Sequence, residues 1–209
     1  MLLRPSETII RQAIKSDPVQ PLVELINHAY RIGEEGILVD TADRPFARVM
    51  QQDVEAFIDQ QKLLVACMKN SKEEGSILGC VKMDRVEESG RQGTAAIGEW
   101  GCLAVSTNHQ QQGLGRRLVE AAEETMRNQW KCKAAQLELL APTNWKHSHK
   151  ERLKEWYTRR MGYRLKVQRG GAAEDDYEAS TSRLPSGSLL GGRFLLATDA
   201  DFTTYYKEL

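Results

Sequence analysis

The chain has 209 residues, of which 41% are hydrophobic and 28% are charged. A chain of this length can bury a core without disulfides or metals, so a single domain over residues 1–209 is expected. Lysine plus arginine and aspartate plus glutamate are equal at 29 each, so the net charge predicts no general attraction to nucleic acid or to an anionic membrane.

Hydrophobic periodicity divides the first half of the chain into a strand, two helices and three further strands. Residues 8–14 are rich in β-branched side chains and predict the first strand. Apolar residues at helical spacing predict helices from Asp17, as N-cap, to Gly36 and from Phe46 to Gln61. Compact apolar runs predict consecutive strands at 62–68, 76–83 and 94–105, which short connections favour as antiparallel.

The second half predicts helices alternating with strands, so the fold class is mixed α/β. The predicted elements are a helix from about 114 to 129, a strand at 133–140, a helix at 148–161 and a strand at 163–168. Residues 169–192 are rich in Gly, Ser, Ala and Asp and predict a long mobile loop between the last two strands.

Cysteine usage and hydropathy predict a reduced protein of the cytoplasm, with the nucleus also open. The four cysteines form no C-x-x-C pair, which argues against a zinc ribbon or a redox motif. His147 and His149 lack a carboxylate or cysteine at regular spacing, so no metal is expected. The first ten residues lack the apolar core of a signal peptide, and no apolar run reaches membrane-spanning length.

The segment "HQQQGLGRRLVEAAEE", residues 109–124, places two glycines at the start of an amphipathic helix. It does not match a P-loop, and Leu118 stands where a dinucleotide fingerprint needs its third glycine. The preceding strand also ends at Val105, eight residues before Gly113, whereas the dinucleotide motif turns directly from strand to glycine.

A helix N-terminus without side chains at 113 and 115 allows a bulky anion to reach the backbone amides. The positive end of the helix dipole favours negative charge there. Arg116 and Arg117 add charge beside the glycines. Pyrophosphate is the natural occupant of such a site.

Two motifs in this order resemble the GNAT superfamily of N-acyltransferases. Gln110-x-x-Gly113-x-Gly115, after a strand ending "LAV", resembles its acyl-CoA signature, and "WYTRRMGYRL" resembles its final helix, Tyr-x-x-x-Gly-Phe/Tyr. In this chain Tyr157 precedes Gly162 by five residues instead of four. The element order matches the family over most of the chain.

The resemblance implies a mostly antiparallel sheet of six or seven strands, flanked by about four helices and splayed between strands four and five. It implies an N-acetyltransferase that moves an acetyl group from acetyl-CoA to a primary amine by direct attack in a ternary complex. The implied partners are a coenzyme A thioester and an amine, either a small molecule or a peptide, with no metal, nucleic acid or membrane. A monomer or a homodimer is expected.

The resemblance assigns the coenzyme to the end of the fourth strand and to the glycine segment. The backbone of strand four would hold the acyl carbonyl and pantetheine, the amides from Gln111 to Gly115 would wrap the pyrophosphate with Arg116, and Asn144 would border the pantetheine arm. The implied cofactor-binding residues are Leu103, Ala104, Val105, Gln110, Gln111, Gln112, Gly113, Leu114, Gly115, Arg116 and Asn144.

Glu99 is the candidate base, because an amine that is protonated at pH 7 must lose a proton before it attacks. Strand alternation predicts that Glu99, Gly101, Leu103 and Val105 share one face. Four residues of strand span roughly 13 Å, so a bulge or a water relay would have to close the gap from Glu99 to Leu103. A solvated position on the strand face is the alternative.

Tyr157 resembles the family tyrosine that returns a proton to the coenzyme A thiolate. The alternative is that its ring only packs against the sheet. Cys102 lies in an apolar strand without a histidine nearby in sequence, which favours a core position over covalent catalysis.

The acceptor site implied by the resemblance lies at the loop joining the first two helices and at the loop between the last two strands. Acidic residues there, which would attract a cationic amine, are Glu34, Glu35, Asp40, Asp43, Glu174, Asp175, Asp176 and Glu178. Solvated surface charge explains them equally well. Two other function classes stay open: a catalytically silent acyl-CoA-binding regulatory module, and a nucleotide- or phosphate-binding domain.

Overall fold

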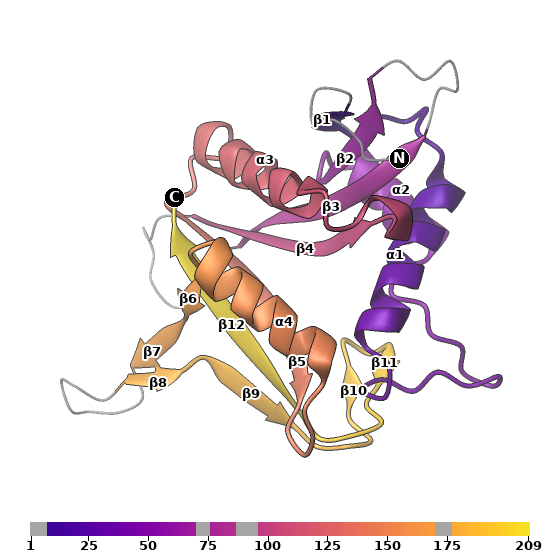
Figure 1. Ribbon diagram of the computed structural model, residues 1–209. Helices are drawn as coiled ribbons and strands as arrows, with labels where there is room; N and C mark the ends of the chain where they lie inside the picture. The colour runs from indigo at the N-terminus through magenta and orange to yellow at the C-terminus, as the bar shows by residue number, and fades with distance from the viewer. Residues whose placement is uncertain (1–7, 70–75, 87–95, 170–176) are drawn as a thin grey trace. The chain divides into compact units, whose positions relative to one another are not determined.

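A computed structural model of the chain describes residues 8–69, 76–86, 96–169 and 177–209. The chain divides into two compact units. Unit 1 contains the residues up to Ile32, Ala47–Ala135 and Leu209, and unit 2 contains Gly33–Phe46 and Gln136–Glu208. Figure 1 labels the helices and strands of each unit. The expectation of a single domain stays a prediction.

Unit 1 is built on an antiparallel sheet in the order β1-β2-β3-β4. Its strands are β1 (Thr8–Gln12), β2 (Leu63–Met68), β3 (Ile77–Val86) and β4 (Ile97–Val105). β2 is buried along nearly its whole length, as its unbroken apolar run predicts. The antiparallel arrangement expected for the three consecutive strands is therefore confirmed.

Helices α1 (Val19–Gly33) and α2 (Gln51–Asp59) cover one face of this sheet. Leu22, Ile26, Val54 and Ile58 pack there in one core cluster with residues of β2, β3 and β4. The predicted helix over 46–61 begins only at Gln51. The Asn27 side chain hydrogen-bonds both the N–H and the C=O of Val49 at 2.9 Å, which holds the preceding backbone extended.

Helix α3 (Leu114–Asn128) covers the opposite face of the same strands. Its Leu118 and Met126 are fully buried. A Cβ atom on Gly98 of β4 would lie 2.3 Å from the Met126 sulfur, so only glycine allows the helix to approach this closely. The glycine segment therefore opens a helix that is fixed firmly on the sheet.

Unit 2 is centred on the long strand β12 (Ala200–Glu208), which pairs antiparallel with β6 (Arg164–Leu165) and β9 (Thr181–Leu184). Helix α4 (Ser148–Glu155) lies over β12 in Figure 1. β5 (Ala134–Pro142) begins at the end of unit 1 and continues in unit 2. Two short hairpins complete the unit: β7 (Val167–Arg169) with β8 (Tyr177–Ala179), and β10 (Leu189–Leu190) with β11 (Phe194–Leu195).

The mixed α/β class, the four α-helices found in the described residues and the mostly antiparallel pairing agree with the expected fold. The segment 169–192 differs from the expected loop, because its described part contains β8, β9 and β10, while residues 170–176 lie outside the described residues. The splay expected between strands four and five stays a prediction. No helix in the described residues is long and apolar enough to cross a membrane.

Asp17 precedes α1 and anchors β1 through a bidentate ion pair. Its carboxylate accepts hydrogen bonds from Arg11 at 2.6 and 2.7 Å and from the Ile14 N–H at 2.8 Å, and its side chain is 4% exposed. Burial raises the pKa of Asp17, but the hydrogen bonds from Arg11 and Ile14 outweigh it and hold that pKa below its usual value of 3.8.

Asp17→Asn is expected to lower the free energy of unfolding by about 1.5–3 kcal/mol at pH 7, because Arg11 loses its charged partner. A carboxylate with a lowered folded pKa stabilises above its unfolded pKa and loses that contribution as the pH falls through the folded pKa. The cost should therefore shrink below about pH 3.8. Urea unfolding at pH 7 and at low pH checks this. Asp59→Asn, which removes an exposed pair with Lys15, is the control and should cost under about 1 kcal/mol.

Candidate functional site

The glycine segment follows β4 through a single turn of 3-10 helix, Thr107–His109. The Gln110 side chain donates to the Val105 C=O at 3.2 Å, and the Gln112 side chain donates to the Asn108 C=O at 3.2 Å. Gln111 and Gly113 both have left-handed backbone, with φ of 60° and 79°. The glutamines in front of the glycines thus fix the loop through contacts with the backbone.

The two glycines have different physical roles. Gly113 is the N-cap of α3, and its positive φ favours glycine whatever the space around it. Gly115 has ordinary helical backbone, and a Cβ there would meet only the Val105 side chain, at 3.8 Å. The fold itself therefore does not require glycine at 115. An absent side chain in open space leaves room for a ligand to reach the backbone.

The amides at the start of α3 are available to an anion. The first intrahelical hydrogen bond runs from the Arg117 N–H to the Gly113 C=O, at 3.1 Å. The N–H groups of residues 114–116 thus have no acceptor within their own helix, and they form the positive end of the helix dipole. Buried Leu114 anchors this turn. The residues present fit a pyrophosphate.

The two arginines beside the glycines differ in what they contact. Arg116 is exposed and pairs with Glu120 one turn later, at 2.9 Å, a solvent-accessible pair that a phosphate can displace. Arg117 turns the other way: its guanidinium donates to the Thr8 hydroxyl and, at 3.0 Å, to the Thr8 C=O. Arg117 therefore ties α3 to β1, and its expected role beside the anion is not supported.

A β-bulge interrupts β4 at Cys102 and Leu103. Gly101 pairs with Lys82 and Ala104 pairs with Cys80, so two residues of β4 oppose Val81 alone. Cys102 has φ of 47°, rare for a residue with a side chain, and its C=O accepts a contact from the Cys80 thiol at 3.8 Å. The bulge turns backbone groups at 102–103 out of the ladder, at the position where the acyl carbonyl is expected.

The bulge overturns the predicted face of β4. Residues directly opposite in an antiparallel pair share a face, so Glu99, Gly101 and Ala104 lie on the face of Asp84, Lys82 and Cys80. Val105 pairs with Gly79 and points toward α3. The expectation that Val105 shares the face of Glu99 is wrong, because the extra residue reverses the alternation.

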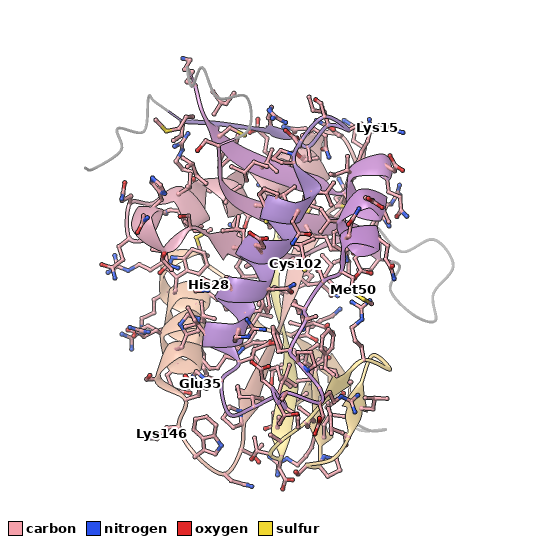
Figure 2. The ribbon with its side chains drawn as sticks, turned by 90° about the vertical axis from the view of Figure 1, so that its right-hand side faces the viewer. Lys15, His28, Glu35, Met50, Cys102 and Lys146 are labelled. Carbon is pink, nitrogen blue, oxygen red and sulfur yellow. The ribbon has the colours of Figure 1, made fainter. Side chains whose placement is uncertain are left out.

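Glu99 is half-buried on the face of the sheet that α1 and α2 cover, among charged neighbours. Directly opposite lies Asp84, whose carboxylate is held by Lys62 at 3.0 Å and by Lys82. Lys82 also stands over the Phe57 ring at 5.1 Å. A Cβ on the nearby Gly101 would meet nothing within 4 Å, so the backbone two residues from Glu99 is not packed against other side chains. Cys102 belongs to the core cluster on this face and is labelled in Figure 2.

Tyr157, in unit 2, lies in a π-helical turn over Trp156–Arg160. The turn is closed by hydrogen bonds from the Met161 N–H to the Trp156 C=O, at 3.1 Å, and from the Tyr163 N–H to the Tyr157 C=O, at 3.0 Å. A π-turn accommodates one extra residue in a helix, which explains the five-residue spacing to Gly162.

The Tyr157 ring is buried against Trp156 and Tyr205, with centroids 5.3 and 6.4 Å away. Burial, and to a lesser extent Tyr205, raises the pKa of Tyr157. The phenol therefore keeps its proton at neutral pH, as a proton donor must before the reaction.

Asn144 is exposed in the loop before α4, and its side-chain oxygen accepts a hydrogen bond from Thr143 at 3.1 Å. His147 caps α4: its Nδ1 accepts from the Lys150 N–H at 3.4 Å. The described residues contain no group of three or more His, Cys, Asp or Glu that could hold a metal ion. The contact of Asn144 with a cofactor stays a prediction.

Unit 1 thus brings together the end of β4 (Leu103, Ala104 and Val105) and the segment from Gln110 to Arg116, and their binding of the coenzyme stays a prediction. Sequence reasoning missed the bulge and the charged neighbours of Glu99. Lys82 and Asp84 are two residues apart in β3, and this spacing was a sequence signal that they share a face with each other. The left-handed backbone of Cys102 had no sequence signal, because such backbone is usually marked by a glycine.

Comparisons with known proteins indicate the family and the fold. A sequence model of the acetyltransferase (GNAT) family matches residues 24–163. A search of curated proteins gave no match. Three solved structures have a similar fold. Arabidopsis thaliana NAA60 in complex with acetyl-CoA is 14% identical, with 97% of this chain and 98% of that chain covered and a TM-score of 0.60. A mutant agmatine N-acetyltransferase in its apo form is 13% identical, with 97% of this chain and 100% of that chain covered and a TM-score of 0.61. The NatC complex bound to Gag peptide and CoA is 14% identical, with 97% of this chain and 99% of that chain covered and a TM-score of 0.58.

Proposed function

The chain belongs to the GNAT acetyltransferase family, and we propose that it moves an acetyl group from acetyl-CoA to a primary amine by direct attack in a ternary complex. The observation that carries the proposal is the pair of glycines at α3: the left-handed backbone of Gly113 favours glycine, while nothing in the packing around Gly115 does, and its bare backbone leaves room for a ligand. Amine-dependent release of coenzyme A, with the acetylated amine found by mass spectrometry, tests it.

In this proposal the amides from Gln111 to Gly115 hold the pyrophosphate, with Arg116 released from Glu120 to join them. Gln110 and Gln112 keep the loop in its binding shape through their backbone contacts. The backbone of Leu103, Ala104 and Val105 holds the pantetheine and the acyl carbonyl. Two family structures with a similar fold contain acetyl-CoA or CoA, which supports this donor.

Glu99 acts as the base. It accepts a proton from the ammonium form of the acceptor, directly or through water, and the neutral amine then attacks the thioester carbon. Backbone N–H groups released by the bulge stabilise the oxyanion, a type of interaction worth about 2.7–4 kcal/mol per donor. The bulge absorbs one residue between Glu99 and Leu103, which shortens the gap that a water relay has to close.

Tyr157 supplies the last proton. When the carbon–sulfur bond breaks, the protonated phenol donates its proton to the departing thiolate, and the second proton of the attacking nitrogen leaves through water to restore the phenol. The buried ring contacts with Trp156 and Tyr205 fix its direction.

Tyr157→Phe is expected to lower kcat by about 10²-fold, because the thiolate would have to leave without a proton donor. The melting temperature should change little, since the ring contacts are kept. Tyr205→Phe is the matched control, because it deletes the hydroxyl of the neighbouring tyrosine, and it should retain most of the activity. Steady-state kinetics of both variants check this, and full activity in Tyr157→Phe would leave the residue a packing role only.

The acceptor site is proposed at the segment 33–46 and at the segment 185–199, which contains β10 and β11. Two of the acidic residues expected there have structural roles: Glu34 is buried in an ion pair with Lys150, and Asp40 accepts a hydrogen bond from the Phe46 N–H at 2.8 Å. Glu174, Asp175 and Asp176 lie outside the described residues. The exposed carboxylates of Glu35 and Asp43 favour a cationic amine.

A catalytically silent acyl-CoA-binding module is the alternative, because the glycine loop would be the same. The half-buried carboxylate of Glu99, two residues from the unpacked backbone of Gly101, favours catalysis, since a sensor does not need a base. A module of this kind would bind acetyl-CoA and release no thiol when amines are added.

A further inference from the structure

Unit 2 buries a pair of charges that acetyl transfer does not use. Lys150 Nζ, in the first turn of α4, lies 3.5 Å from Glu34 Oε1, just after α1. The two side chains are 6% and 4% exposed. A buried ion pair adds little net stability, because desolvation offsets the attraction. The best-supported role of such pairs is to select one arrangement of the chain.

Close contacts between glycine backbone and ring side chains surround this pair. A Cβ on Gly33 would lie 3.4 Å from His149 Nε2, and a Cβ on Gly36 would lie 3.4 Å from the Trp145 ring. The turn at 33–36 is therefore pressed directly against the segment that leads into α4. Figure 2 shows Glu35, the exposed neighbour of Glu34, at the end of α1.

The rest of the segment 33–46 is held by the β10–β11 hairpin. The Val39 N–H donates to the Leu195 C=O and the Ala197 N–H donates to the Ile37 C=O, both at 2.9 Å. The Phe46 and Phe194 rings pack with centroids 6.3 Å apart. Segment 33–46 is thus attached to the start of α4 at one end and to the hairpin along its length.

We propose that Glu34 and Lys150 form a positioning pair that holds segment 33–46 in a single conformation. The apolar and ring contacts of the segment are not directional, so they would tolerate small shifts of segment 33–46 along its neighbours. The ion pair would oppose such shifts, because separating Glu34 from Lys150 breaks the pairing of two buried charges. A fixed segment gives the acceptor a preformed site, so the pair governs acceptor affinity; this last step rests on the proposed function.

The test replaces the pair as a whole. Glu34→Leu/Lys150→Met exchanges two charges for apolar groups of similar size, which should keep the melting temperature within a few degrees of the parent. Hydrogen exchange of the Val39 amide should nevertheless become roughly tenfold faster, since the segment can then open locally. Wild-type protection of Val39 in the double variant would overturn the proposal.

The single variant Glu34→Gln leaves Lys150 buried without a carboxylate and should accelerate exchange at Val39 at least as much; unchanged exchange would count against the proposal. If this variant fails to fold, the double variant still decides. The matched control is Arg183→Gln/Asp201→Asn, which removes an exposed ion pair between β9 and β12, and it should leave exchange at Val39 unchanged. If the control accelerates exchange equally, the effect belongs to unit 2 as a whole and the proposal fails.

Kinetics distinguish positioning from a purely structural role. In the double variant, KM for the acceptor should rise roughly fivefold while KM for acetyl-CoA stays the same, because segment 33–46 is proposed to contact only the acceptor. Equal changes in both constants would overturn the positioning role. If no amine is acetylated by the parent protein, the proposed function fails, and the exchange of Val39 still decides whether the pair holds the segment.

Discussion

Gly115→Glu is expected to weaken binding of coenzyme A by more than about 100-fold, or about 2.7 kcal/mol. The new side chain would stand in the space over the first turn of α3, where a Cβ meets only Val105 at 3.8 Å. It would place a carboxylate at the end of the helix that binds anions, so that like charges repel. Because that space is open, the fold should be kept. Isothermal titration calorimetry measures the loss.

Bulk and charge can be separated at the same position. Gly115→Gln adds the same volume without charge and should bind coenzyme A more tightly than Gly115→Glu. Gly115→Ala adds only one methyl group at a helical position and should melt at or above the parent temperature, because alanine favours the helix. Tight binding of coenzyme A by Gly115→Glu would place the pyrophosphate elsewhere.

Glu99→Gln is expected to lower kcat/KM by about 10²–10⁴-fold at neutral pH while leaving the affinity for coenzyme A unchanged. Without the base, only the small fraction of acceptor that is already neutral can attack. The deficit should therefore be largest at low pH and should shrink as the pH rises. A pH–rate profile of the parent and the variant, with binding measured in parallel, checks both parts.

Asp84→Asn is the matched control for this result. It makes the same chemical change on the residue directly opposite Glu99, and on the same face. The Asp84 carboxylate is already held by Lys62 and Lys82, so it is not positioned to accept a proton from the amine. Its loss should cost much less activity. An equal loss in both variants would show that the charge of this face matters and that Glu99 has no special role.

Much of the fold could be predicted because many elements depend on local sequence patterns. The strand β2 follows from its unbroken apolar run, and the helix around Leu118 follows from apolar residues at helical spacing. The start of α2 could not be predicted, since the Asn27 side chain, 22 residues away from Val49, holds the backbone extended where propensity favours a helix.

At the candidate site, the glycine segment was predictable because a phosphate loop needs particular residues at fixed spacing. Gly113 and Gly115 lie where the pattern placed them. The face of Val105 was predicted wrongly, because a bulge at Cys102 depends on pairing with β3 and reverses the alternation that sequence alone implies. The extra residue after Tyr157 was visible in the sequence, but only the structure shows that a π-turn accommodates it.

Protection against heat distinguishes a coenzyme A site from the site of a general nucleotide-binding domain. A ligand that binds only the folded state raises the melting temperature in proportion to its affinity and concentration. Coenzyme A should therefore protect the protein, whereas nicotinamide and adenine nucleotides at the same concentration should protect it much less. An equal rise in melting temperature with adenine nucleotides would show that the site recognises only phosphate and adenine.

The most direct measurement is release of free thiol from acetyl-CoA in the presence of polyamines, amino acids, arylamines and peptides, each tested separately. At least one cationic amine is expected to accelerate thiol release and to be recovered in acetylated form, and Glu99→Gln should reduce this rate. Binding of acetyl-CoA with no amine-dependent release of thiol across the whole panel would contradict the proposed acetyl transfer.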